Sequence, residues 1–106
     1  MNATEKKRLE AAGWRVGGAA EFLDLSPEEA VLVDLKIGLA DLMKALRSKH
    51  RWTQSEVAER CGSSQSRIAK LEAADATVSI DLLMRCLVTL GATRREIARV
   101  IASRAA

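Results

Sequence analysis

Residues 54–72 read QSEVAERCGSSQSRIAKLE, and the spacing of small and apolar residues in this stretch indicates the architecture of the domain. Gly62 lies where a tight turn between two helices needs a left-handed backbone, which glycine adopts at little cost. Ala58 is small where the two helices must approach closely. The apolar residues expected to face the shared core are Val57, Cys61, Ile68 and Leu71. This spacing predicts two short helices that pack at about a right angle across a turn.

The rest of the chain also favours helices. Its 106 residues include one Pro, one Phe and no Tyr, and 48% are hydrophobic, which is enough for one domain with a modest core. No apolar run of roughly 18 residues is present, so the sequence predicts no membrane span. Residues 1–10 are charged and lack the apolar centre of a signal peptide, so we expect a cytoplasmic location.

Residues that cap helix N-termini divide the chain into five main helices, which predicts an all-α fold. The capping-box pairs are Ser26 with Glu29, Thr53 with Glu56, and Thr93 with Glu96, and the single caps are Ser64 and Ser79. The helices are expected at about 27–49, 54–61, 65–73, 80–90 and 94–103. Gly38 marks a point where the first helix could bend.

The chain is expected to divide at residue 26. Residues 1–26 are predicted as an N-terminal extension, with a short helix at 4–12 and an extended piece with a helical turn at 14–25. Residues 27–106 are predicted as the helix-turn-helix domain, with the helix-turn-helix itself at 54–73. Such a unit places its second helix in the major groove of DNA.

The charge distribution agrees with a polyanionic partner. Residues 1–35 carry a net charge of −3, whereas residues 36–106 carry +6. Cys61 and Cys86 have no neighbouring His or Cys and are expected to be buried apolar residues, and the single His50 is assigned no catalytic role. Because the chain offers no nucleophile–base pair, metal cluster or phosphate-binding glycine loop, the sequence indicates neither an enzyme nor a cofactor.

From residue 42 to about residue 91, the sequence resembles the lambda/434 repressor-like (Xre) helix-turn-helix family. The matching motif is Thr53-Gln54, Glu56-Val57-Ala58, Cys61-Gly62, Ser64-Gln65, Ile68 and Leu71-Glu72. The resemblance implies a five-helix repressor-like domain, and an ion pair between Arg47 and Glu72. The sequence differs from the family pattern in the loop after the expected helix at 65–73. There Ala74 replaces the usual glycine, and Asp75 adds a negative charge.

The N-terminal part of the chain resembles a subgroup of that family, the HigA-type antitoxins. The motifs that carry this are Gly13-Trp14-Arg15-Val16-Gly17, Glu21-Phe22-Leu23 and Ser26-Pro27-Glu28-Glu29. The resemblance implies an antitoxin that pairs with a RelE/HigB-like ribonuclease toxin and represses its own operon. The alternative is a free-standing regulator of the same family with no toxin partner.

The resemblance also implies which residues touch double-stranded DNA. Ser64, Gln65, Ser66, Arg67 and Lys70 are expected to face the major groove, with Gln65 and Ser66 reading bases and Arg67 either reading a base or holding a phosphate. We expect phosphate contacts from Thr53, Gln54 and Ser63, although capping alone would also explain Thr53.

A single module of this size seldom gives enough specificity, so we expect a homodimer on a palindromic operator. The last helix offers one candidate surface, since Ile97, Val100 and Ile101 lie along one face. The same stripe could equally be ordinary core.

Overall fold

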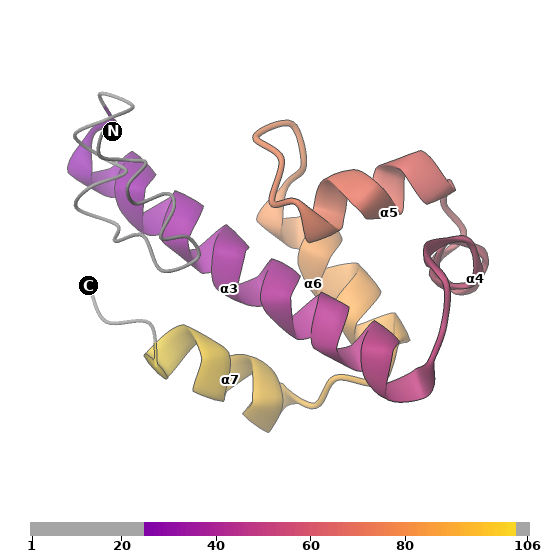
Figure 1. Cartoon of the computed structure of the whole chain (residues 1–106). Coiled ribbons are helices and arrows are strands. Elements are labelled where there is room, and N and C mark those ends of the chain that lie inside the picture. The colour runs from indigo at the N-terminus through magenta and orange to yellow at the C-terminus, as the bar shows by residue number, and fades with distance from the viewer. Residues whose placement is uncertain (1–24, 104–106) are drawn as a thin grey trace. The chain divides into compact units, whose positions relative to one another are not determined.

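A computed structural model describes residues 25–103, which form five α-helices and no strand (Figure 1). The helices are α3 (Pro27–His50), α4 (Gln54–Cys61), α5 (Gln65–Glu72), α6 (Ile80–Thr89) and α7 (Arg94–Ser103). The predicted all-α fold with five main helices is therefore confirmed. The short helix expected at 4–12 and almost all of the extended piece expected at 14–25 lie outside the described residues.

The described part of the chain falls into two units, residues 25–34 and residues 35–103. Within the first unit, the described part is the start of α3 and the Ser26 cap before it. The second unit contains the rest of α3 and the other four helices. Helix α3 runs without a break through Gly38, where a bend had been considered. No helix among residues 25–103 is long and apolar enough to cross a membrane.

The helices begin where the capping residues predict. In each of the three capping boxes, the glutamate carboxylate accepts from the cap amide while the cap hydroxyl accepts from the glutamate amide. In α4, for example, the Thr53 amide lies 2.8 Å from Glu56 Oε1, and the Glu56 amide lies 3.0 Å from Thr53 Oγ1. Ser64 and Ser79 each cap the following helix through the side-chain oxygen alone.

Helices α3, α4, α5 and α6 all end in the same hydrogen-bond pattern, the Schellman motif. A residue with positive φ follows each helix: Arg51 (58°), Gly62 (64°), Ala74 (54°) and Gly91 (101°). The next amide bonds back across the last turn, as from Ser63 to the Ala58 carbonyl at 2.8 Å and from Asp75 to the Lys70 carbonyl at 3.0 Å. The helix ends lie within one or two residues of the predicted positions, but a left-handed backbone was expected only at the two glycines and not at Arg51 and Ala74.

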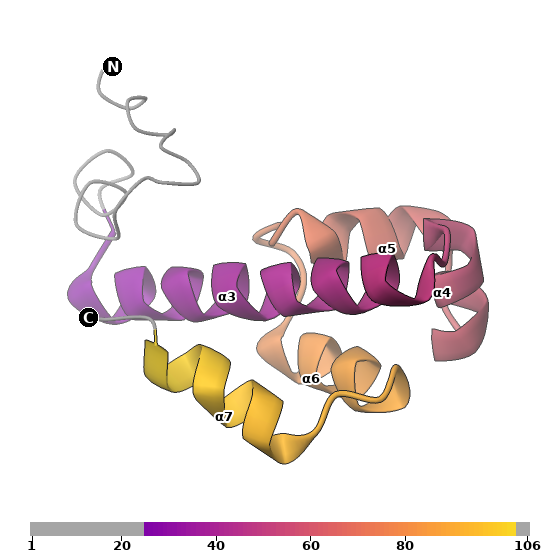
Figure 2. The same ribbon diagram turned by 60° about the horizontal axis from the view of Figure 1, so that its bottom comes forward.

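The core of residues 35–105 lies where α3, α4, α5 and α6 meet. The large side chains that are fully buried there are Leu39, Met43, Val57, Ile68, Leu71, Leu83 and Leu87. Helix α7 adds Ile97, which belongs to the same cluster, and Val100, which packs against it. Ile101 is 38% exposed, so the apolar stripe of α7 is core at two positions and surface at the third. Figure 2 shows α6 and α7 on the side of the domain away from α5.

Candidate nucleic-acid interface

Helices α4 and α5 form the predicted helix-turn-helix. Gly62 takes the left-handed conformation between them, with φ 64° and ψ 39°. Val57 and Ala58 of α4 are buried against Ile68 and Leu71 of α5, and Cys61 packs at the edge of the same cluster. This packing holds α5 on the surface of the domain with only its inner face covered.

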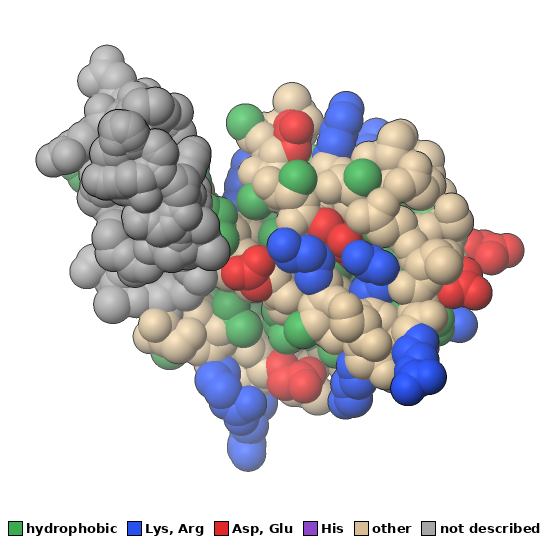
Figure 3. Space-filling view, viewed as in Figure 1, with side chains coloured by type: hydrophobic (Ala, Val, Ile, Leu, Met, Phe, Trp, Pro, Cys, Tyr) green, Lys and Arg blue, Asp and Glu red, His purple; other side chains and the backbone are tan. Residues whose placement is uncertain are grey.

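The outer face of α5 is polar and exposed. Gln65, Ser66, Arg67 and Lys70 are all exposed, as is the Ser64 cap, while Ser63 is half-buried in the turn. Figure 3 shows Lys and Arg side chains projecting beyond α5 at the upper edge of the molecule. Gln65, Ser66 and Arg67 thus lie in the accessible first turn of α5, and Lys70 is exposed in its last turn.

An ion pair ties the end of α5 to α3. Arg47 Nε lies 2.6 Å from Glu72 Oε2, and Arg47 Nη2 lies 3.0 Å from Glu72 Oε1. The Glu72 side chain is only 5% exposed and that of Arg47 is 25% exposed. The hydrogen bond to Glu72 raises the pKa of Arg47, so the guanidinium stays charged. The structure therefore contains the ion pair that the resemblance implied.

Two glutamines extend this pair to the start of both helices. Gln54 Nε2 donates to Glu72 Oε1 at 3.1 Å, and Gln65 Nε2 donates to Gln54 Oε1 at 2.6 Å. The sequence indicated separate roles for Gln54 and Gln65, and it gave no sign of a contact between them. One feature of the sequence could have indicated the contact between Gln54 and Gln65. Each glutamine is the first residue of a helix, and the helix-turn-helix brings the starts of these two helices together.

The N-terminus of α5 differs electrostatically from the other described helix starts. Helices α3, α4, α6 and α7 each carry an acidic residue in the first turn, whereas α5 carries none. Its cap, Ser64, accepts from the Arg67 amide without adding charge. Because free amides and the helix dipole favour an anion at a helix start, α5 can accept a phosphate near its N-terminus without competition from a carboxylate.

Thr53 is occupied in a different way. Its amide and its hydroxyl oxygen both bond to Glu56, whose carboxylate adds negative charge at the start of α4. The capping role is therefore visible in the structure, and only the hydroxyl proton of Thr53 remains available for a phosphate.

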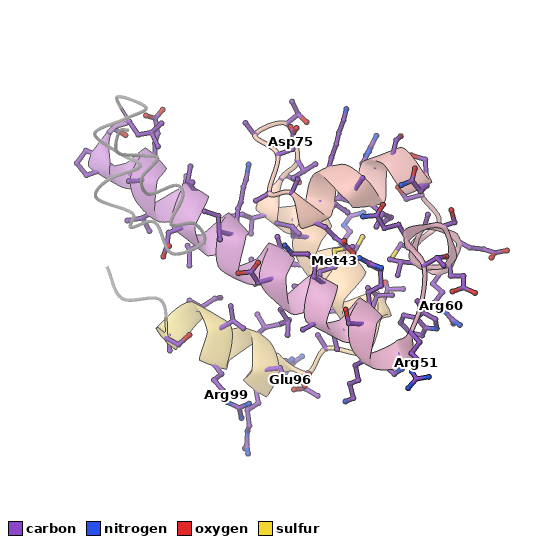
Figure 4. All side chains as sticks on the ribbon, in the orientation of Figure 1. Met43, Arg51, Arg60, Asp75, Glu96 and Arg99 are labelled. Atoms are coloured by element: carbon purple, nitrogen blue, oxygen red, sulfur yellow. The ribbon has the colours of Figure 1, made fainter. Side chains whose placement is uncertain are left out.

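The loop after α5 is closed by its own side chains. Asp75 Oδ1 accepts from the Thr77 amide at 2.8 Å and from the Thr77 hydroxyl at 2.6 Å. The hydrogen bond from the Thr77 side chain, with that from its amide, lowers the pKa of Asp75. Figure 4 places Asp75 at the tip of this loop, where its carboxylate adds a negative charge.

Sequence reasoning missed an aromatic stack at the corner between α3 and α4. The rings of His50 and Trp52 are stacked with their centroids 4.3 Å apart, and Arg60 Cζ lies 4.1 Å from the centroid of Trp52. Figure 4 shows Arg60 and Arg51 on this same corner. The stack joins the end of α3 and the segment before α4 to the last turn of α4, where Arg60 adds positive charge.

The two cysteines behave as buried apolar residues. Cys86 is buried in the core, and Cys61 is half-buried beside it. Burial, helped by a hydrogen bond with Cys86, raises the pKa of Cys61 to about 12, which keeps its thiol protonated. Among residues 25–103, no three His, Cys, Asp or Glu side chains are grouped so that they could hold a metal ion.

The sequence of this helix-turn-helix region matches the model of a known protein family. A model of the helix-turn-helix domain family matches residues 39–100, which is more than half of the chain. The chain belongs to this Xre-like helix-turn-helix family. Members of such families are DNA-binding regulators, and the matched region contains all of α4 to α6, the second half of α3 and most of α7. Comparisons with curated proteins and with solved structures gave no significant match.

Proposed function

We propose that this protein is a sequence-specific transcriptional repressor that acts in the cytoplasm and reads DNA with α5. The proposal is supported mainly by the N-terminus of α5, which is surrounded by exposed polar and basic side chains. Among the described helices, α5 alone has no acidic residue in its first turn. A helix presented in this way fits the major groove, and its free amides fit the phosphates at the groove's edge.

Each exposed residue of α5 has a role that its chemistry permits. Gln65 matches the edge of adenine, because its amide offers one donor and one acceptor side by side. Arg67 matches either guanine or a phosphate, and Ser66 accepts or donates to either kind of base. Lys70 is also exposed and adds positive charge towards the DNA backbone.

Phosphate contacts are proposed for residues around the two helix starts. Ser63 and Ser64 lie in the turn before α5, where the amides are free of carboxylate neighbours. Gln54 lies at the first position of α4 and has its side chain held by Glu72. Thr53 is proposed to donate only its hydroxyl proton, since its other polar atoms serve the capping box.

The proposed repressor acts as a homodimer on a palindromic operator. Two copies of α5 would read half-sites spaced about 34–36 Å apart, one turn of the duplex. The exposed Ile101 of α7 and the 63% exposed Val88 of α6 supply apolar surface for pairing. Ile97 and Val100 are excluded from that surface because they pack in the core.

We further propose that the repressor is the antitoxin of a type II toxin–antitoxin pair, with a RelE/HigB-like ribonuclease as its partner. This rests on the motifs between residues 13 and 29, most of which lie outside the described residues. The second candidate is a free-standing regulator of the same family. The neighbouring gene separates them, because a small basic reading frame, toxic when expressed alone and neutralised by this protein, supports the antitoxin.

Fluorescence anisotropy tests the DNA-binding proposal. The probes are a duplex from immediately upstream of the protein's own gene and a scrambled duplex of the same composition, measured across a salt series. Tight binding to the native duplex, with two protomers per site, is expected. A variant carrying Gln65→Ala and Arg67→Ala should lose this preference.

A matched control removes the same charge elsewhere. Arg85 on α6 is 75% exposed and pairs only with Asp81 on its own helix among the described contacts. Arg85→Ala should leave the preference for the native duplex intact. Unchanged discrimination in the Gln65 and Arg67 variant would contradict the proposed role of α5.

A further inference from the structure

The exposed side of α7 is basic. Arg94, Arg95 and Arg99 are all exposed, and these three residues form what we call the arginine face of α7. The core-facing side of the same helix carries Ile97 and Val100. Because Arg95 and Arg99 are four residues apart, their side chains are neighbours on the outer surface of the helix.

The arginines of α7 have no acidic partner. Among the ion pairs of residues 25–103, none includes an arginine of this helix. The contrast is with α6, where Arg85 lies 3.2 Å from Asp81 at the same four-residue spacing. In α7 this spacing joins Arg95 to Arg99, and two like charges so placed repel each other. The arginine face is therefore a cost to the helix that an anion bound to it would relieve.

The one carboxylate of α7 is already used. Glu96 accepts from the Thr93 amide at 2.8 Å in the capping box that begins the helix. This hydrogen bond, with smaller contributions from the positive charges of Lys49 and Arg99, lowers the pKa of Glu96. Lys49 is exposed at the end of α3, so a second helix adds positive charge beside the arginine face.

The arginine face lies on the other side of the domain from the proposed DNA-reading helix. Figures 1 and 2 both place α7 away from α5, and Figure 4 shows Arg99 directed away from the rest of the domain. In Figure 3, a second group of Lys and Arg side chains follows the lower edge of the molecule, opposite the edge at α5. A duplex held by α5 would therefore leave the arginine face uncovered.

The chemistry of this face suits phosphate groups. All the cations of α7 are arginines, whose planar guanidinium matches two oxygens of a phosphate at once. An acidic protein surface would also attract arginines. However, a protein bound to DNA through α5 is surrounded by the phosphates of neighbouring DNA, which makes DNA the polyanion at the highest local concentration.

We propose that the arginine face of α7 binds the phosphate backbone of a second duplex, so that the protein bridges two segments of DNA. The inference rests on the proposed function, because α5 must hold the first duplex. It is compatible with pairing of two copies through Ile101. At about 100° per residue, Ile101 lies roughly 120–160° around α7 from Arg95 and Arg99, so pairing there leaves both arginines open.

The test is a two-duplex capture with the full chain. A biotinylated duplex from upstream of the protein's own gene is fixed to beads and loaded with protein, and a fluorescent duplex of scrambled sequence is added after washing. The test variant carries Arg95→Gln and Arg99→Gln, and a charge-retaining variant carries Arg95→Lys and Arg99→Lys. The control, Lys44→Gln with Arg85→Gln, removes two positive charges from exposed positions on α3 and α6.

The parent, the control and the lysine variant should each hold both duplexes. The glutamine variant should remain on the first duplex but bind the second at least about tenfold more weakly, because two phosphate contacts are lost. For that second binding step, the slope of log affinity against log salt should fall by about two. A role confined to the stability of α7 would change the Tm and leave this slope unaltered.

Four results would overturn the inference or separate it from the proposed function. Equal capture of the second duplex by the glutamine variant overturns it, because bridging would then depend on other residues. Loss of the first duplex by that variant, or loss of the two-protomer mass in light scattering, also overturns it. A parent that holds only the first duplex refutes the role of α7 alone. A parent that does not prefer the native first duplex to a scrambled one refutes the proposed function.

Discussion

The four Schellman ends allow a direct measurement of left-handed backbone strain in this fold, because glycine is present at only two of them. Consider Gly62→Ala in the turn between α4 and α5. A Cβ built on Gly62 meets nothing within 4 Å, so steric conflict with neighbouring groups adds nothing to the cost. What remains is the left-handed conformation itself at φ 64°, which costs an L-residue about 1–2 kcal/mol.

Part of this cost is offset in the unfolded chain. Alanine has less backbone freedom than glycine when unfolded, which favours the folded state by about 0.4–1 kcal/mol. The net expectation is that Gly62→Ala lowers the free energy of unfolding by about 1 kcal/mol. For a domain of this size, that corresponds to a fall of roughly 4–8 °C in Tm.

Ala74→Gly is the reciprocal change at the end of α5, where φ is 54°. It should raise the free energy of unfolding by a few tenths to about 1 kcal/mol, since relief of the same strain outweighs the entropy that glycine adds to the unfolded chain. Thermal and urea unfolding followed by circular dichroism measure both variants. The reasoning is refuted if Gly62→Ala is as stable as the parent, or if it loses more than about 3 kcal/mol, which would require a collision that the structure does not contain.

Three further predictions concern charge. Arg47→Met should lower the free energy of unfolding by about 3–5 kcal/mol, because it leaves Glu72 charged and buried, and adding Glu72→Leu should recover most of the loss in urea unfolding. The hydrogen bond from the Thr93 amide lowers the pKa of Glu96. The ionised Glu96 carboxylate therefore stabilises the fold above the ordinary glutamate pKa, and this contribution is lost as the pH falls through the lowered pKa. Glu96→Gln lacks this ionisation, so its Tm should fall less on acidification than that of the parent protein. Arg67→Ala should reduce the slope of log affinity against log salt by about one if Arg67 holds a phosphate, and relax the preference at one base pair if it reads guanine.

The helix starts were predictable from the sequence because each depends on residues three positions apart. A Ser or Thr hydroxyl and a Glu carboxylate at that spacing satisfy the free amides of the first turn wherever the helix later packs. The turn at Gly62 was equally local, since glycine is the residue that takes positive φ without strain.

The left-handed conformations of Arg51 and Ala74 were not predictable in this way. Neither residue favours the left-handed conformation, so the packing of the helices on either side must impose it. The Arg47–Glu72 pair was expected from resemblance to a family, because nothing in the spacing of two residues 25 apart indicates contact. The stack of His50, Trp52 and Arg60 was not predicted either, because the spacing of these residues along the chain does not indicate that their side chains are in contact.

The all-α fold, the starts of the helices and the polar face of α5 follow from the order of the residues alone, because helix periodicity and capping act over one or two turns. The contacts of Gln54 with Gln65 and with Glu72 became visible only in the folded chain. These contacts join helices whose relative placement depends on the packing of the whole core around Met43, Ile68 and Leu71. A hydrogen bond requires its two atoms within about 3 Å, and only the assembled core holds separate helices to that tolerance.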